Sequence, residues 1–161
     1  MKPEELVRFL TTLGETPDRI LQLTQGLDHQ ALTWKPSSKD FSILENVCHL
    51  RDIEAEGYNV RIERLLTEDR PRLPDVDGTR LAQERDYNAQ DLKAALQGFR
   101  AARVRSLQLL KGVRPAALER EGELETVGRI TLEGILLKMV EHDRGHIDEV
   151  TQLVDRLVEE K

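Results

Sequence analysis

Two histidines, His142 and His146, lie four residues apart in a long segment whose hydrophobic residues have helical spacing. A separation of four residues puts both imidazoles on one helix face, close enough to bind one metal ion. His146 also follows Met139 by seven residues, so the pair is expected to face the core side of its helix. The other apolar residues of this stripe are Leu132, Ile135, Leu136, Val150 and Leu153. The pair is therefore the first candidate for a buried metal site.

A third histidine, His49, lies in an earlier helical segment, at the border between its apolar and acidic faces. Ile53 and Val60 continue the apolar stripe beside it, and the acidic residues on its other flank are Glu45, Asp52 and Glu56. Glu45 lies one turn before His49 and is placed to orient its ring by a hydrogen bond. Neutral imidazole is a common ligand of zinc and nickel, and three protein ligands leave open positions for water or substrate. A catalytic rather than a closed structural site is expected.

The same histidines also fit a bundle without metal. Two histidines four apart are a weak signal, because a buried histidine is often only hydrogen-bonded. The glutamate of the HExxH protease motif is missing, since position 143 is Asp143, and a protease of that type is disfavoured. Asp143 is expected to be solvated, Cys48 to pack in the core, and His29 to lie on the surface or cap a helix end. Aromatic residues expected to serve packing are Trp34, Tyr58 and Tyr87.

Four long helices are predicted to position the histidines. Residues 1–27 keep a seven-residue apolar repeat across Pro17, which favours one kinked helix over two shorter ones. Ser42 and Glu45 fit a capping box that starts a helix reaching about residue 66. Asn88 is predicted to cap a third helix, which Gly112 and Pro115 close, and Thr131 to cap the last, which runs to about residue 159.

The segments between these helices are predicted connectors. Residues 34–40 are polar and contain Pro36, and residues 115–130 combine short helical and extended fragments. Residues 69–87 are rich in proline, glycine and charge and form the longest connector. Longer loops often cover functional sites, so this segment is a candidate lid. The fold class is therefore all-α, a four-helix bundle in a single domain over residues 1–161.

Composition excludes several classes of protein. The 161 residues carry a net charge of −6, with 34% charged and 4% aromatic residues. No basic face is evident, because Arg100, Arg103 and Arg105 fan around a helix as a solvated face, so nucleic-acid binding is not expected. The single cysteine excludes an internal disulfide and fits a reducing compartment. Neither a membrane span nor a signal-peptide core is present, so a cytoplasmic protein without membrane partners is predicted.

Two blocks of sequence resemble the DinB/YfiT-like family. The first runs from Trp34-Lys35-Pro36 through Phe41-Ser42-Ile43-Leu44-Glu45 to His49-Leu50-Arg51-Asp52-Ile53-Glu54. The second comprises Ile130-Thr131-Leu132 and then His142-Asp143-Arg144-Gly145-His146-Ile147. Their order and separation both match the family, and the one departure is Phe41 where tryptophan is commoner.

This resemblance implies a DinB-like four-helix bundle, often a homodimer, that holds a divalent metal through three histidines. On this chain they are His49, His142 and His146. Characterised relatives include transferases and isomerases that use a low-molecular-weight thiol such as mycothiol or bacillithiol. The substrate is not implied by these motifs.

The leading hypothesis is a metal-dependent thiol S-transferase. Zinc or nickel would lower the pKa of a bound thiol, and the thiolate would attack a small-molecule electrophile beneath residues 69–87. A metal-dependent hydrolase is the nearest variant. The alternatives from other classes are a non-catalytic, stress-associated metal-binding bundle and a helical interaction module without metal. No catalytic side chain or cofactor-binding residue beyond the three histidines is assigned.

Overall fold

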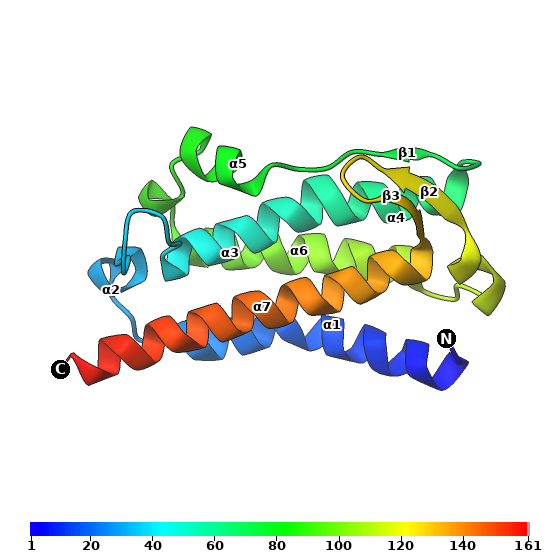
Figure 1. Cartoon of the computed structure of the whole chain (residues 1–161). Coiled ribbons are helices and arrows are strands. Elements are labelled where there is room, and N and C mark those ends of the chain that lie inside the picture. The colour runs from blue at the N-terminus through cyan, green and yellow to red at the C-terminus, as the bar shows by residue number, and fades with distance from the viewer. Residues whose placement is uncertain (161) are drawn as a thin grey trace.

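The computed structural model describes residues 1–160 and contains four long helical rods (Figure 1). These rods are α1 (Pro3–Thr24), α3 (Ile43–Asp52) continued by η1 (Ile53–Tyr58) and α4 (Asn59–Thr67), α6 (Leu92–Leu110), and α7 (Leu132–Glu159). The shorter elements are α2 (His29–Thr33), β1 (Arg72–Leu73), α5 (Gly78–Glu84), η2 (Tyr87–Ala89), η3 (Pro115–Glu119), β2 (Glu121–Leu124) and β3 (Gly128–Thr131). The predicted all-α four-helix bundle is confirmed, with a small three-stranded sheet at one end.

The order of the rods requires one long crossover. In Figure 1, α1 and α7 run in the same direction, and the α3–α4 rod and α6 run together in the opposite one. The chain leaves α4 and returns along the α3–α4 rod through β1 and α5 before α6 begins. β1 pairs in parallel with β2, and β2 pairs antiparallel with β3. The sheet therefore joins the start of this crossover to the α6–α7 connection.

Local capping explains where the second and fourth rods begin. The Ser42 hydroxyl accepts a 3.0 Å hydrogen bond from the Glu45 backbone N–H, and the Glu45 carboxylate accepts one of 2.9 Å from the Ser42 N–H. This is the predicted capping box. The Thr131 hydroxyl accepts from the N–H of Gly134 at 3.0 Å and caps α7, as predicted.

The predicted start of the third rod is wrong by three residues. Asp91, rather than Asn88, caps α6, and its carboxylate accepts from the Ala94 N–H at 2.9 Å. Asn88 lies in the preceding single turn η2, where its side chain accepts from the Ser42 hydroxyl at 2.6 Å. Asp91 is the cap because it stands directly before Leu92, the first residue of the helix and an apolar one.

The first rod is one continuous helix through Pro17, so the alternative of two shorter helices is wrong. Its buried apolar residues, Leu6, Leu13 and Ile20, keep the predicted seven-residue spacing. The helix ends at Thr24, and His29 follows as the exposed first residue of α2. Residues 69–87, predicted as a loop, also contain β1 and the short helix α5.

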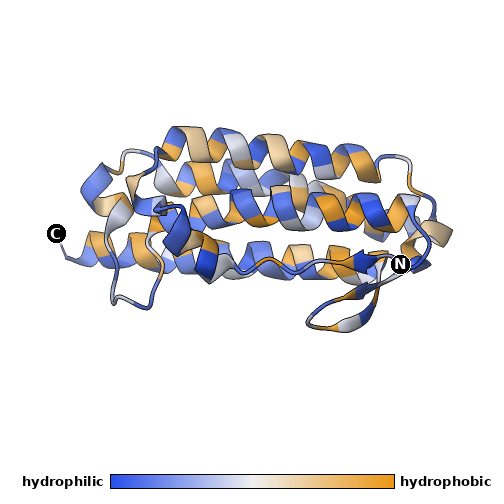
Figure 2. Ribbon diagram, turned by 90° about the horizontal axis from the view of Figure 1, so that it is seen from above, coloured by the Kyte–Doolittle hydropathy of each residue, from blue (hydrophilic) through white to orange (hydrophobic). Residues whose placement is uncertain are grey.

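The core consists of two apolar clusters with a polar layer between them. Hydrophobic and hydrophilic residues alternate around each rod (Figure 2), as amphipathic packing requires. Along α1 the first cluster ends at Leu13 and the second begins at Ile20. Along α7 the first ends at Val140 and the second begins at Ile147. The polar side chains that lie between these limits on α1 and α7 include Thr16, His142, Asp143 and His146. None of the helices within residues 1–160 is both long and apolar enough to cross a membrane.

Candidate metal centre

Three histidines converge in the polar layer of the bundle. His49 projects from α3, and His142 and His146 project from neighbouring turns of α7. The Nε2 atoms of His49 and His142 are 3.0 Å apart, and one candidate donor atom from each of the three rings lies within 4.8 Å of the other two. The helix geometry predicted for the pair is thus observed, and the third imidazole comes from a segment 93 residues earlier in the chain.

Asn46 fixes the orientation of His146. The side-chain amide of Asn46 is fully buried and donates through Nδ2 to the Ser42 carbonyl at 2.9 Å. Its Oδ1 therefore faces His146 as an acceptor, 2.7 Å from Nδ1. Nδ1 of His146 must then carry the proton, which leaves the Nε2 lone pair free. A hydrogen bond on the far nitrogen is the usual way in which proteins orient a metal-binding imidazole.

The environment keeps the imidazoles neutral. Burial, assisted by the neighbouring His146, lowers the pKa of His49 and of His142 from 6.5 to about 3, and the positive charge of Arg103 contributes to the lowering for His142. Burial also lowers the pKa of His146. A metal ion requires unprotonated imidazole nitrogens, so all three rings are in the ligand form near neutral pH.

The donor set fits a divalent metal ion that imidazole nitrogens can bind. Two nitrogen ligands on one ion, with bonds of about 2.1 Å, lie roughly 3 Å apart, which is the spacing of the two Nε2 atoms. Nδ1 of His49 is buried and has no hydrogen-bond partner among the described residues. Without a metal, the Nε2 atoms of His49 and His142 share at most one proton, because only one of the two can donate in the contact between them. An ion bound by the Nε2 atoms would satisfy lone pairs that face one another.

Acidification tests this electrostatic arrangement in the metal-free protein. Because the histidine pKa values are lower in the folded than in the unfolded chain, the unfolded chain binds more protons between about pH 6.5 and pH 3. The free energy of unfolding should be unaffected by these groups above pH 7 and fall below pH 6.5, by about 1.4 kcal/mol per pH unit for each histidine.

Urea unfolding measured from pH 7.5 to 4.5 checks this slope. The His49→Gln variant should show a shallower slope by roughly one proton, whereas substitution of the exposed His29 by Gln should leave it unchanged. An equal slope in wild type and His49→Gln would contradict the assignment.

A buried ionic network lies beside the histidines in the same layer. Arg103 of α6 is 2% exposed and donates to both carboxylates of Glu54 and Asp143, at distances of 2.6 to 3.0 Å. It also donates to the Leu13 carbonyl at 2.7 Å, and Thr16 of α1 donates to Asp143 at 2.6 Å. Glu54 lies in the π-helical turn η1. The network thus joins all four rods one residue away from His142.

Three predictions about polar residues near the site are wrong. Glu45 does not orient His49, because its carboxylate completes the capping box and pairs with Lys35 at 3.2 Å. Asp143 and Arg103, predicted to be solvated, are buried. Sequence reasoning also missed Asn46.

The predictions for the less central residues hold. Cys48 is buried, and so are the packing residues Tyr58 and Tyr87. His29 lies on the surface, at the start of α2 and away from the cluster.

Fold and site together define a four-helix-bundle protein with a candidate three-histidine metal centre. The family model of the DinB superfamily matches residues 12–150, and the chain belongs to that superfamily. The chain is similar in structure to a solved protein, YfiT from Bacillus subtilis. That protein is described as "a probable metal-dependent hydrolase with an unusual four-helix bundle topology". Its TM-score is 0.90 at 23% identity, over 98% of this chain and 90% of that one. Comparison with curated proteins gives no match.

Proposed function

We propose that this chain is a metal-dependent enzyme in which His49, His142 and His146 hold a divalent ion that activates a small nucleophile. The proposal rests on the convergence of three neutral imidazoles from two helices that are far apart in the sequence. No carboxylate or thiolate belongs to the donor set, so a bound ion would keep its full charge of +2. Such an ion acidifies a bound water or thiol, and three protein ligands leave a position open for it.

For the nucleophile we propose a low-molecular-weight thiol that is transferred to an electrophile. The family resemblance of the two sequence blocks supports this choice. The chain's own thiol is unsuited to the role: Cys48 is fully buried, and burial raises its pKa to about 11. Its sulfur lies 4.0 Å from the Tyr87 carbonyl oxygen and 3.8 Å from the side-chain oxygen of Gln90. The thiol would therefore be an external substrate of the mycothiol or bacillithiol type.

Hydrolysis by a water molecule that a bound ion would activate is the second candidate. The similarity in fold to YfiT, described as a probable metal-dependent hydrolase, favours it. The histidine donor set suits both reactions, because water and thiol would be activated by the same charge. The two candidates differ only in whether turnover needs an added thiol.

Turnover assays on zinc- and nickel-loaded protein separate these functions. Thiol transfer is expected to require the ion and an added thiol, to stop on chelation, and to be absent in His142→Ala. Ester or amide cleavage without any thiol would favour the hydrolase. Metal binding without turnover in either assay would contradict the enzyme and leave a metal-binding bundle. The His29→Ala variant is the matched control, since His29 is exposed and distant from the cluster.

Asn46→Ala is expected to weaken zinc binding by about 10- to 100-fold, because it removes the acceptor that orients His146. The expected loss is smaller than that for any histidine, since all three donors remain. Competition with a chromophoric chelator measures this change. Asn46→Asp keeps an acceptor at the same place and should retain binding. Zinc affinity in Asn46→Ala equal to that of wild type would show that the 2.7 Å contact has no role in orienting the ligand.

A further inference from the structure

Residues 76–86 lie against His49 of the histidine cluster and belong to the crossover that leads from α4 to α6. Gly78, at the start of α5, is the point of closest approach. A Cβ atom built on Gly78 would lie 2.5 Å from Cε1 and 2.7 Å from Nδ1 of His49. Only a residue without a side chain allows the backbone to approach an imidazole so closely. We call residues 76–86 the strap.

The strap itself is lightly attached to the bundle. Within residues 76–86, Ala82 is the one buried side chain, Val76 and Leu81 are half-buried against the core, and most of the others are exposed. A segment with few buried contacts opens at a low free-energy cost compared with the core. Opening of the strap therefore depends chiefly on what holds its two ends.

The first end is fixed to the sheet end of the bundle. Just before the strap, β1 pairs with β2, and the buried Arg61 donates to the Pro74 carbonyl at 3.1 Å and to the Asp75 carboxylate at 3.2 Å. Asp75 also accepts from the Thr126 hydroxyl at 2.7 Å. These bonds hold the entry to the strap in place.

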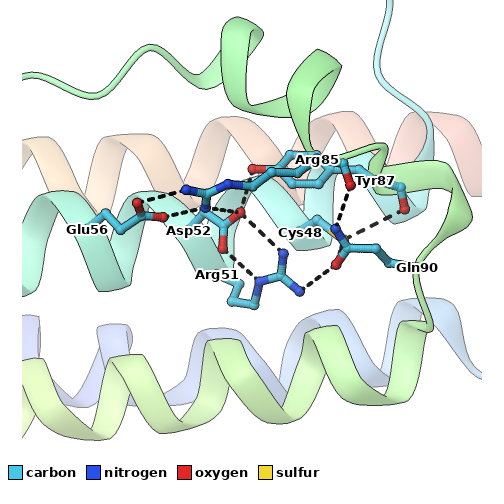
Figure 3. Close-up of polar contacts among 7 residues, drawn as sticks. All are labelled: Cys48, Arg51, Asp52, Glu56, Arg85, Tyr87 and Gln90. Carbon is cyan, nitrogen blue, oxygen red and sulfur yellow. Dashed lines mark hydrogen bonds and ion pairs between the residues drawn. The ribbon is translucent and has the colours of Figure 1, made fainter.

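The second end is fixed by a carboxylate of α3 (Figure 3). Asp52 is 6% exposed, accepts a 2.6 Å hydrogen bond from the Tyr87 hydroxyl, and pairs with Nη1 of Arg85 at 3.0 Å. Arg85 also donates to Glu56 at 2.9 Å. Asp52 lies one turn after His49 on the same helix. We call Asp52, Glu56, Arg85 and Tyr87 the latch.

A backbone feature separates the two latch residues contributed by the crossover. Asp86, between Arg85 and Tyr87, has a φ of +46°, a left-handed conformation that is uncommon for a residue with a side chain. Such strain persists where surrounding contacts impose it. The latch bonds on either side of Asp86 are among those contacts, together with the bonds that the Arg85 and Asp86 carbonyls accept from Gln90 and Ala89. Loss of the latch should therefore weaken the hold on this residue and let the strap move.

We propose that the strap is a lid over the histidine cluster and that the latch, centred on Asp52, holds it closed. Asp52 is a positioning residue in this scheme. It touches neither the cluster nor a substrate, and it acts through Arg85 and Tyr87 on the backbone at Gly78. The importance of the lid for catalysis rests on the proposed function, whereas the closing of the strap over the histidines does not.

Labelling of histidines by diethyl pyrocarbonate tests the lid in metal-free protein. The exposed His29 serves as the internal reference within each molecule. The cluster histidines should react slowly in wild type, and faster by roughly tenfold relative to His29 in Tyr87→Phe and Arg85→Gln. Arg105→Gln is the matched control, because Arg105 forms an exposed ion pair with Glu63, and neither residue belongs to the strap or the latch. Equal labelling in wild type and latch variants would overturn the proposal.

Hydrogen exchange distinguishes opening of the strap from general loosening. Peptides that cover residues 76–86 should exchange faster in the latch variants, by about tenfold, while peptides from α1 and α6 stay unchanged. Uniformly faster exchange along the chain would overturn a specific latch.

Zinc release to a chelator gives a further readout in protein that binds zinc. It should also accelerate in the latch variants, with the number of ions per chain unchanged. Failure of the wild type to bind zinc would refute the metal centre alone, since labelling and exchange judge the strap without it.

Discussion

Replacing Arg103 by leucine is expected to lower the free energy of unfolding by about 3–5 kcal/mol, a larger loss than we expect from any other single substitution in the polar layer. The guanidinium is 2% exposed and forms four hydrogen bonds to Glu54 and Asp143. Its removal leaves two carboxylates buried in the middle of the bundle without their counter-ion. For a chain of this length the melting temperature should fall by about 10 °C.

Two further variants make this result specific. Arg100→Leu, on the same helix, removes an exposed guanidinium whose partner Asp18 is also exposed, and should change stability by less than about 1 kcal/mol. The triple variant Arg103→Met, Glu54→Gln and Asp143→Asn removes the charges together and should recover most of the loss. A melting temperature of Arg103→Leu within a few degrees of wild type would contradict a stabilising role for this network.

Zinc is expected to stabilise the wild-type chain and to have almost no effect on His142→Asn. Zinc at about a thousand times its dissociation constant should add about 4 kcal/mol to the free energy of unfolding, because it binds the folded chain alone. His142→Asn removes one of three ligands, so this gain should nearly vanish. Thermal melts with zinc and with excess chelator measure the difference. His29→Ala should behave as wild type, and equal stabilisation of His142→Asn would exclude the cluster as the site.

Helix geometry made two of the three histidines predictable as one group. The spacing of His142 and His146 places both rings on the inward face of α7, which the structure shows. The place of His49 depends on how α3 packs against α7, a long-range property that periodicity on either helix does not contain. The sequence placed His49 at the border between the apolar and acidic faces of its helix, and the family resemblance joined it to the pair.

The burial of Arg103 and Asp143 was not predicted, because charged side chains on helices are usually solvated. The sequence does contain a signal for it. Arg103 stands between Phe99 and Ser106 at helical spacing, on the buried face of α6, and Asp143 follows Met139 by four residues on the stripe of α7. A charge in the middle of an apolar stripe indicates a buried ion pair when an opposite charge occupies the facing stripe. Which stripes face each other is set by the tertiary fold.

The contact of Asn46 with His146 was not predicted for a related reason. It neighbours Glu45, and the capping box explained that segment of sequence without it. Only the crossing of α3 and α7 brings its amide to His146. The strap was correctly located as a connector, but its contact with His49 depends on the crossover that the parallel direction of α3–α4 and α6 requires.

Metal content per chain tests the central claim most directly. Tag-free wild type, His29→Ala, and the alanine variants of His49, His142 and His146 would each be reconstituted with zinc and with nickel, desalted, and analysed by native mass spectrometry. The three-histidine site predicts one ion per chain in wild type and His29→Ala, and almost none in each cluster variant. A metal-free wild type, or one ion retained in all three cluster variants, would contradict it.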